Sequence, residues 1–220
     1  MALDGIEIET GDDPTASIIM LHGLGADGND FVSFVDELDL SVVGAVRFVF
    51  PHSPVRPVTI NGGHVMRAWY DILPPGMARR EDEQGLRESQ AEVEALITRE
   101  QARGIEASRI VLAGFSQGGA MTLLTGLRRA DQLAGLVGLS CYLPLADKTL
   151  DELSPANRDT PIFLAHGTSD PVVAFDRGQA ARDALQALHY KVEWHEYPMP
   201  HSVCQAEITD LNQWLVRVLS

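Results

Sequence analysis

Short apolar runs recur along this 220-residue chain and predict the strands of a buried sheet. Residues 5–10 (GIEIET) alternate apolar and polar side chains, which is typical of a strand with one exposed face. The run at 17–21 (SIIML) is apolar almost throughout, as in strands that are buried on both faces. The other predicted strands cover residues 46–50, 109–113, 136–140, 161–165 and 191–197.

Helical patterns lie between these runs. In residues 81–103, apolar side chains recur at helical spacing from Leu86 to Ile97, and Gly104 supplies a stop. The other predicted helices cover residues 31–38, 119–129, 176–188 and 205–219. Strands that alternate with helices in this way predict an α/β fold, with a mostly parallel central sheet and helices on both faces.

Residues 51–66 show neither the alternation typical of a strand nor the spacing typical of a helix. They hold three prolines and the pair Gly62–Gly63, which together predict a long loop. Long loops in compact domains are usually functional or disordered. No internal repeat or low-complexity segment is present, so we expect one α/β domain over residues 1–220.

Charge and composition narrow the function classes. The formal net charge is −14, which argues against binding nucleic acid or an anionic membrane through bulk electrostatics. No apolar run approaches the roughly 18 residues of a membrane-spanning helix. The first ten residues lack the basic and apolar regions of a secretory signal. We therefore expect a cytoplasmic protein in which Cys141 and Cys204 are reduced thiols.

The pentapeptide 114–118 (GFSQG) places Ser116 between a predicted strand and a predicted helix. The pattern G-x-S-x-G alone would occur by chance in roughly one chain in ten of this length. At a strand-to-helix turn, however, it predicts a nucleophile elbow, in which a tight turn lifts the serine hydroxyl above the sheet. The alternative is a serine that only caps the helix.

The residues that follow the other predicted strands supply partners for this serine. Asp170 follows the strand at 161–165, and His201 follows the strand at 191–197. Because loops at the carboxyl ends of parallel strands meet at one edge of the sheet, the three side chains are expected to converge. Their chain order, Ser, Asp, His, is that of an α/β-hydrolase triad. Ser116 would be the nucleophile, His201 the base, and Asp170 the group that orients the base.

An oxyanion needs two backbone N–H donors. Gln117, directly after the serine, offers one, and Leu24 in the glycine-rich turn after residue 21 offers the other. The remaining histidines and the neighbouring aspartates are expected to be structural or solvated residues; they are His22, His52, His64, His166, His189, His195, Asp147, Asp151, Asp159 and Asp176. No metal-ligand spacing occurs, so no metal is expected.

Six motifs in order make the chain closely resemble the carboxylesterase/acyl-protein thioesterase family of small α/β-hydrolases, also called the phospholipase/carboxylesterase family. They are residues 21–28 (LHGLGADG), 67–71 (RAWYD), 114–121 (GFSQGGAM), 141–144 (CYLP), 166–173 (HGTSDPVV) and 201–204 (HSVC). The resemblance implies the same roles for the triad and for the two oxyanion donors. It also implies hydrolysis of carboxyl esters with medium-to-long acyl chains, without a cofactor.

The resemblance further implies an apolar groove beside the serine. Its candidate residues are Trp69, Ile72, Leu73, Leu143, Val172 and Val173, with Met66 and Met77 as further candidates; the alternative for each is ordinary core packing. Acyl-protein thioesterase or lysophospholipase activity is the alternative to a carboxylesterase acting on a small-molecule ester. Integral membrane insertion is not expected, and the resemblance admits a homodimer. A binding protein that has lost catalysis is disfavoured by the intact triad, and a dienelactone-hydrolase-like enzyme would need cysteine in place of Ser116.

Overall fold

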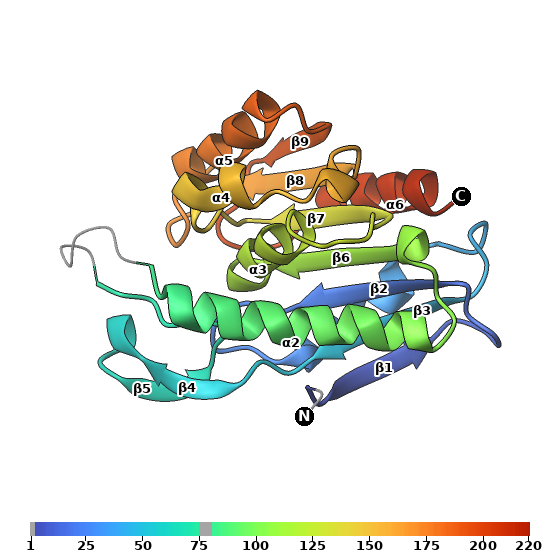
Figure 1. The fold of residues 1–220 in the computed structure, drawn as a ribbon, viewed down its shortest axis with the longest axis horizontal. Helices are drawn as coiled ribbons and strands as arrows, with labels where there is room; N and C mark the ends of the chain where they lie inside the picture. Colours follow the sequence, from blue (N-terminus) through green and yellow to red (C-terminus); the bar gives the residue numbers. More distant parts are fainter. Residues whose placement is uncertain (1–2, 75–80) are drawn as a thin grey trace.

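A twisted seven-stranded sheet runs through the centre of the molecule (Figure 1). The computed structural model describes residues 3–74 and 81–220. The strands lie in the order β1-β3-β2-β6-β7-β8-β9, and only β1 is antiparallel to its neighbour. Their bounds are β1 Gly5–Glu9, β2 Ala16–Leu21, β3 Val46–Pro51, β6 Ile110–Phe115, β7 Gly135–Leu139, β8 Ile162–Gly167 and β9 Val192–Tyr197.

Burial follows the sequence pattern strand by strand. Every residue of β2, β3, β7 and β8 is buried, because helices cover both faces of the sheet there. In β1 exposed and half-buried residues alternate, as expected for an edge strand. The predicted strands and the mostly parallel sheet are therefore confirmed.

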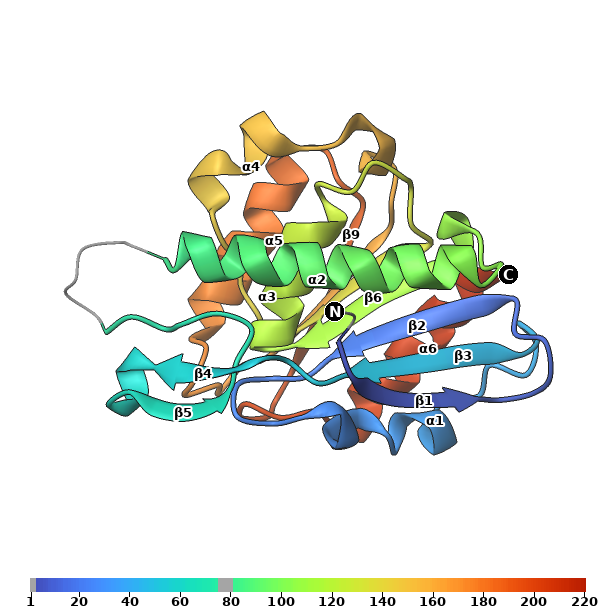
Figure 2. The same cartoon turned by 60° about the horizontal axis from the view of Figure 1, so that its bottom comes forward.

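Helices cover the two faces of the sheet (Figure 2). One face carries α2 (Glu83–Ala102), α3 (Gln117–Gly126), α4 (Ala146–Glu152) and α5 (Phe175–Ala187). The other carries α1 (Phe34–Glu37) and α6 (Gln205–Leu219). Short 3-10 turns occupy Gly28–Phe31, Thr59–Asn61, Ala107–Arg109 and Pro155–Asn157. None of the helices in the described ranges combines the length and the apolar character that crossing a bilayer requires.

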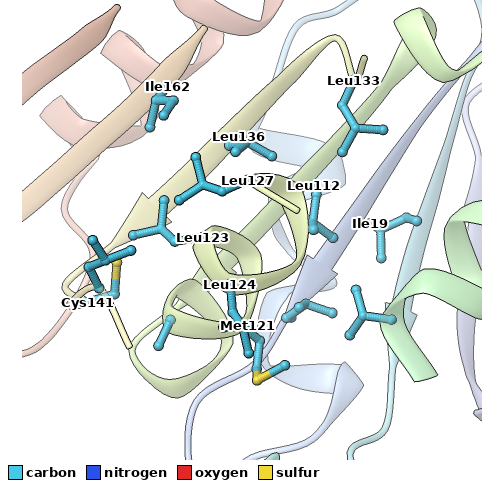
Figure 3. Close-up of a cluster of buried hydrophobic side chains, with 14 of the residues drawn as sticks. Ile19, Leu112, Met121, Leu123, Leu124, Leu127, Leu133, Leu136, Cys141 and Ile162 are labelled. Carbon is cyan, nitrogen blue, oxygen red and sulfur yellow. The ribbon is translucent and has the colours of Figure 1, made fainter. Parts of the chain in front are cut away.

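Two hydrophobic cores lie on opposite faces of the shared sheet. Figure 3 shows part of the first, where Leu123 and Leu124 of α3 lie among side chains from β2, β6 and β7. All ten residues of α3 are buried, which makes it the most enclosed helix on this face. Burying a Leu or Ile side chain contributes about 1.5–3 kcal/mol, so this packing anchors α3 and the turn that precedes it.

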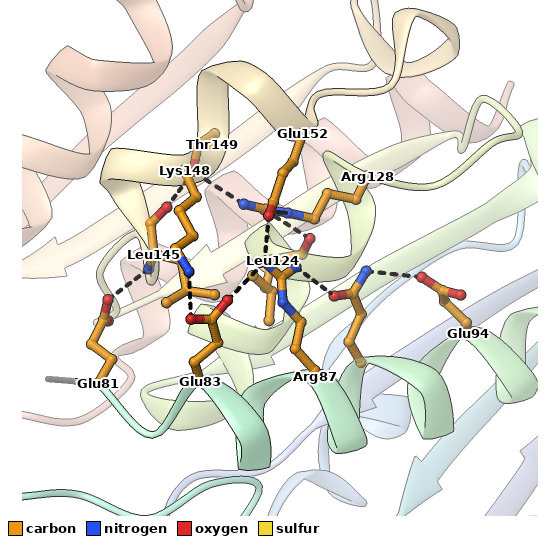
Figure 4. Close-up of polar contacts among 11 residues, drawn as sticks. Glu81, Glu83, Arg87, Glu94, Leu124, Arg128, Leu145, Lys148, Thr149 and Glu152 are labelled. Atoms are coloured by element: carbon orange, nitrogen blue, oxygen red, sulfur yellow. Dashed lines mark hydrogen bonds and ion pairs between the residues drawn. The ribbon is translucent and has the colours of Figure 1, made fainter.

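Ion pairs join α4 to α2 and to the end of α3 (Figure 4). Glu152 accepts from Arg87 at 2.5 Å and from Arg128 at 2.6 Å, and Lys148 donates to Glu83 at 2.5 Å. Of these pairs, the pair of Lys148 and Glu83 is the most exposed, and exposed pairs are each worth about 0–1 kcal/mol, whereas the Arg128 side chain is largely buried. Glu83, in the first turn of α2, therefore contacts α4 and is not only a solvated side chain.

Three expectations about elements are corrected. Residues 51–66 are not simply a loop, because β4 (Val55–Val58) and β5 (His64–Arg67) form an antiparallel hairpin. Its four-residue strands and Pro57 hide the period, whereas Gly62 and Gly63, with φ of 67° and 77°, provide the turn. The predicted helix at 31–38 is a 3-10 turn followed by the four-residue α1. Helix α4 was not predicted at all.

Candidate active site

Ser116 lies in a strained turn between β6 and α3. Its φ of 55° and ψ of −117° fall in a backbone region that residues other than glycine rarely adopt. The glycines on either side are required by close backbone contact. A Cβ on Gly118 would lie 2.1 Å from the carbonyl oxygen of Leu21, and one on Gly114 would lie 2.3 Å from the backbone of Gly118. This is the geometry of a nucleophile elbow.

Ser116, His201 and Asp170 form a hydrogen-bonded chain. The Ser116 hydroxyl lies 3.0 Å from His201 Nε2, to which it can donate, and His201 Nδ1 lies 2.6 Å from Asp170 Oδ2. The ring of His201 packs against Phe115, with 4.7 Å between ring centres. With a proton on Nδ1 directed at the carboxylate, Nε2 is left as the acceptor that a serine nucleophile needs.

Backbone groups hold Asp170 in place. Its side chain is fully buried, and Oδ1 accepts from the N–H groups of Val172 and Val173 at 2.8 and 2.9 Å. His166 donates through Nε2 to the carbonyl oxygen of Val173 at 2.9 Å, and the same nitrogen lies 3.5 Å from Asp170 Oδ2. His166 therefore supports the loop that carries the aspartate. Its place at a strand end was the only sequence signal for this role.

Two N–H groups next to the serine have no acceptor among the described residues: those of Leu24 and Gln117. The loop that carries Leu24 lies against the elbow, because a Cβ built on Gly23 would be 3.5 Å from Ser116 Cβ. Gln117 is the first residue of α3, whose N-terminal N–H groups have no partner within the helix. These groups can stabilise a negative oxygen that forms beside Ser116.

His22 fixes the loop that carries Leu24. Its Nδ1–H donates to the carbonyl oxygen of Gly23 at 2.7 Å, and Nε2 accepts from the N–H of Ser53 at 3.0 Å. Burial lowers the pKa of His22, which favours the neutral ring that this pair of bonds requires. His22 is thus a structural residue of the site.

The side chain of Gln117 joins the elbow to the segment at Trp69 and Tyr70. Its Oε1 accepts from the Trp69 N–H at 2.8 Å, and its Nε2 donates to the Tyr70 carbonyl oxygen at 2.7 Å. The indole of Trp69 in turn donates to the His22 carbonyl oxygen at 2.9 Å. The sequence predicts a role only for the backbone N–H of Gln117, because nothing local indicates which groups its side-chain amide reaches.

The candidate groove residues do not share one surface. Ile72 and Leu73 line one hollow, and Leu143 lines another. Val172 is 67% exposed, whereas Val173 is buried and contributes its N–H to Asp170. The exposed fraction of Trp69 is 0%, so it offers no surface to a substrate; it packs beneath the oxyanion loop, which corrects the expectation that it lines the groove.

Two methionines are further candidates for the groove. Met66 is half-buried on β5, and its sulfur accepts from Asn61 Nδ2 at 3.4 Å. Met77 lies outside the described residues.

The described residues include other cysteine and histidine side chains, which form no hydrogen bond with Ser116, His201 or Asp170. Cys141 is buried, and burial raises the pKa of its thiol to about 12, so the thiolate nucleophile is scarce. His52 accepts from the Gly28 N–H, and His195 bonds with Glu193. Within residues 3–74 and 81–220, no cluster of three or more potential metal ligands occurs.

Comparisons with known proteins cover nearly the whole chain. A family model described as phospholipase/carboxylesterase matches residues 3–219. The chain belongs to this family. Acyl-protein thioesterase 1 of Yarrowia lipolytica is 42% identical over 206 residues, which cover 91% of each protein. Acyl-protein thioesterase 1 of Neurospora crassa is 42% identical over 215 residues, covering 93% of this chain and 87% of the relative.

Solved structures of relatives share the fold. SOBER1 of Arabidopsis thaliana has a TM-score of 0.87 at 33% identity, covering 93% of this chain and 99% of the other. Acyl-protein thioesterase 2 of Zea mays has a TM-score of 0.85 at 27% identity, covering 99% and 100%. The predicted α/β-hydrolase fold is therefore confirmed, and this phospholipase/carboxylesterase family member is a serine hydrolase of the esterase and thioesterase group.

Proposed function

We propose that the protein is a serine carboxylesterase that hydrolyses esters with medium-to-long acyl chains through a covalent acyl-enzyme on Ser116. The observation that carries the proposal is the continuous chain from the Ser116 hydroxyl through His201 to the buried Asp170 carboxylate. A serine is a weak nucleophile without a base, and here both the base and the group that orients it are in contact.

The reaction proceeds in two halves. Ser116 Oγ attacks the ester carbonyl carbon while its proton passes to His201 Nε2. The N–H groups of Leu24 and Gln117 stabilise the oxyanion of the tetrahedral intermediate, and a misplaced or missing donor typically costs about 3 kcal/mol. Collapse of the intermediate expels the alcohol, which takes the proton from His201. Water, whose proton passes to His201, then attacks the acyl-enzyme; the bond between Ser116 Oγ and the acyl carbon breaks, the carboxylic acid leaves, and His201 returns the proton to Ser116.

A second candidate activity is hydrolysis of acyl thioesters on proteins, and the same alternative includes lysophospholipase-type hydrolysis of a lipid oxygen ester. The names of the fungal relatives, which are 42% identical, favour this candidate. The acylation step uses the same residues for an ester and for a thioester. A thiol leaves more readily than an alcohol, so a thioester needs no further catalytic residue. Rates on an S-acylated protein and on a free ester of the same acyl chain, measured at equal enzyme concentration, separate the two.

Replacement of Ser116 tests the triad directly. In Ser116→Ala we expect kcat on p-nitrophenyl esters to fall by a factor on the order of 10⁴ or more, with an unchanged melting temperature. Ser41→Ala, at an exposed serine that bonds only with Asp39, is the matched control and should keep wild-type activity and labelling. A fluorophosphonate probe should label the wild type and not Ser116→Ala. Labelling of Ser116→Ala at the wild-type rate would contradict the proposal.

The pH profile tests His201 as the base. Lowering the pH from 8 to 5 should reduce kcat/KM, because a protonated ring cannot accept the serine proton. A profile that stays flat over that range, with the enzyme still folded, would exclude this role for His201.

We further propose that residues 1–220 act as one catalytic domain, since both hydrophobic cores share one sheet. Cytoplasmic residence is proposed from the two free thiols, Cys141 and Cys204. A homodimer is the remaining proposal, and sedimentation of the purified protein at micromolar concentration tests it.

A further inference from the structure

Two hollows lie on either side of one stacked pair of side chains, Tyr142 and Arg177. The first has a volume of about 140 Å³ and is bounded by Tyr70, Ile72 and Leu73. The second has a volume of about 150 Å³ and runs over Leu143 towards the alanine-rich face of α5. Tyr142 and Arg177 line both hollows, so this pair is the wall between them.

The wall is held by stacking. The guanidinium carbon of Arg177 lies 3.8 Å from the centre of the Tyr142 ring, and the Tyr142 hydroxyl shares a 2.6 Å hydrogen bond with the hydroxyl of the buried Tyr70. No carboxylate among the described residues lies within ion-pair distance of Arg177. Arg177 itself is exposed on the first turn of α5. Its position therefore depends on a fixed aromatic ring, and its side chain can move away without breaking an ion pair.

Apolar side chains are available on both sides of the wall. Ile72 and Leu73 face the first hollow, whereas Leu143, Ala146, Ala181 and Ala184 face the second.

The three carboxylates at the rim of the first hollow are engaged with the protein itself. Asp71 accepts from Thr59, Asp82 accepts from the Gly85 N–H, and Glu81 accepts from the Leu145 N–H (Figure 4). An aliphatic chain that follows the two hollows would meet mainly apolar surface once the guanidinium is out of the way.

The hollows belong to the same edge of the sheet as Ser116. The Tyr70 carbonyl oxygen at the first hollow accepts from the side chain of Gln117, the residue after the serine. Tyr142 follows β7, whose Leu139 carbonyl oxygen accepts from the Ser116 N–H. Arg177 lies in the first turn of α5, the helix that follows the Asp170 loop.

We propose that the side chain of Arg177, stacked on Tyr142, divides a longer acyl-binding groove in two and thereby sets the acyl-chain length that the enzyme prefers. The proposal rests on the esterase function proposed above. A cavity of about 150 Å³ holds a benzene-sized group, so each hollow accommodates about six carbons. With Arg177 in place the chain ends in the first hollow, which favours the medium-length end of the proposed range of acyl chains, and without it the chain continues into the second.

The test is a chain-length profile. We would measure kcat/KM for p-nitrophenyl esters from four to sixteen acyl carbons, each below its aggregation concentration, for the wild type, Arg177→Ala and Arg177→Lys. Each newly buried methylene is worth about fourfold in affinity, so Arg177→Ala should raise the ratio of twelve-carbon to four-carbon kcat/KM by at least about tenfold. Arg177→Lys keeps the charge but not the planar stack, and should shift the ratio less in the same direction.

Arg182→Ala is the matched control. Arg182 lies on the same helix and stacks over Trp194 at 5.1 Å from the ring centre, but it lines neither hollow. Its profile should superpose on that of the wild type. Superposition of the Arg177→Ala and Arg177→Lys profiles on the wild type would overturn the proposal, as would an equal shift in Arg182→Ala.

The failure of the esterase assignment would look different. A wild-type enzyme that hydrolyses no ester and takes up no fluorophosphonate label would contradict the proposed function. A wild type active on short esters, with no response to either Arg177 variant, would contradict only the division of the groove.

Discussion

The elbow around Ser116 and the groove segment, residues 53–73, meet at one site but are held in opposite ways. In the elbow, backbone lies against backbone, and added Cβ atoms at Gly114 and Gly118 would come within 2.1–2.3 Å of main-chain atoms. The groove segment carries the exposed hairpin, and it is joined to the rest of the site by the buried side chains of Trp69 and Tyr70 and by hydrogen bonds. Gln117 bonds two of its backbone groups, and the Gly25 N–H donates to the Arg67 carbonyl oxygen.

This difference separates the chemistry from the choice of substrate. Contacts of backbone on backbone leave no room for variation, because any side chain at these positions displaces a strand or a helix. Hydrogen bonds at the border of the groove segment can persist while its exposed side chains change. We therefore expect substitutions in the elbow to abolish activity and substitutions in the groove segment to alter selectivity or stability by smaller amounts.

The largest effect is expected for Gly118→Ala. The new methyl group would overlap the Leu21 carbonyl oxygen, a backbone atom that cannot move without shifting β2. We expect a loss of at least about 3 kcal/mol of stability together with most of the esterase activity. Gly62→Ala is the control from the groove segment. Its φ is 67° but its surroundings are open, so only the backbone strain of about 1–2 kcal/mol applies. Thermal unfolding and kcat on a short ester measure both variants, and equal losses in the two would show that the elbow tolerates an added side chain as well as the hairpin does.

The next effect is expected at the border between the two regions, in Gln117→Ala. Truncation leaves the Trp69 N–H and the Tyr70 carbonyl oxygen buried without a partner, which costs about 1–3 kcal/mol per group. The backbone N–H of residue 117 remains, but its segment is less firmly held, and kcat/KM should fall by about 10- to 100-fold. Gln84→Ala, which removes an exposed Gln on α2, is the control. Unchanged kcat/KM in Gln117→Ala would show that the groove segment holds its position without this bond.

A smaller effect is expected from a buried carboxyl behind the loop that carries His201. Glu207 of α6 is fully buried, and burial raises its pKa from 4.5 to about 8. The folded protein therefore holds a proton that the unfolded chain releases between these two values, so stability should decline as the pH rises through that window. In Glu207→Gln this decline should be reduced, leaving the variant more stable than the wild type by about 1–3 kcal/mol at pH 8.5.

Denaturant unfolding between pH 6.5 and 8.5 measures this effect, and that range avoids the opposite contribution of His22. The pKa of His22 is lowered by burial, so its contribution to stability is lost at lower pH. Glu88→Gln, at an exposed position of α2, should run parallel to the wild type. A Glu207→Gln curve that is also parallel would mean that Glu207 does not take up a proton on folding.

The smallest effect is expected in the hairpin of the groove segment. Val65 on β5 is 59% exposed, so Val65→Thr keeps the β-branched shape and removes little buried surface. We expect the free energy of unfolding to stay within about 0.5 kcal/mol and kcat on a short ester to stay within about twofold. Circular-dichroism melts and ester hydrolysis check this, and a large loss of stability would show that the hairpin is packed more tightly than its exposure indicates.

The sequence predicted most of the sheet and the candidate triad because both leave local signals. Buried strands are apolar runs, and Ser116, Asp170 and His201 each follow one of them. Helix α4 escaped prediction because its seven residues contain no apolar period and it is positioned by ion pairs to α2. The hairpin of β4 and β5 escaped because short strands with a proline are hard to tell from a loop.

Trp69 shows why the groove was harder to predict than the triad. A tryptophan in a loop beside the serine is as compatible with a substrate wall as with packing, and only its contact with the His22 carbonyl oxygen decides between them. The amide of Gln117 is a similar case. Its partners lie 47 and 48 residues earlier in the chain, and no local pattern carries that information.

Local patterns were thus sufficient for the order of the elements and for the strained serine turn, because each depends on neighbours in the chain. The candidate triad partners could be expected because each follows a strand of the same parallel sheet. The wall between the two hollows depends on three segments that are far apart in sequence, at Tyr70, Tyr142 and Arg177. Whether Arg177 meets an aromatic face, a carboxylate or only water is decided by how α5 packs beside the loop after β7. That is a property of the folded molecule, since long-range packing places those side chains in contact.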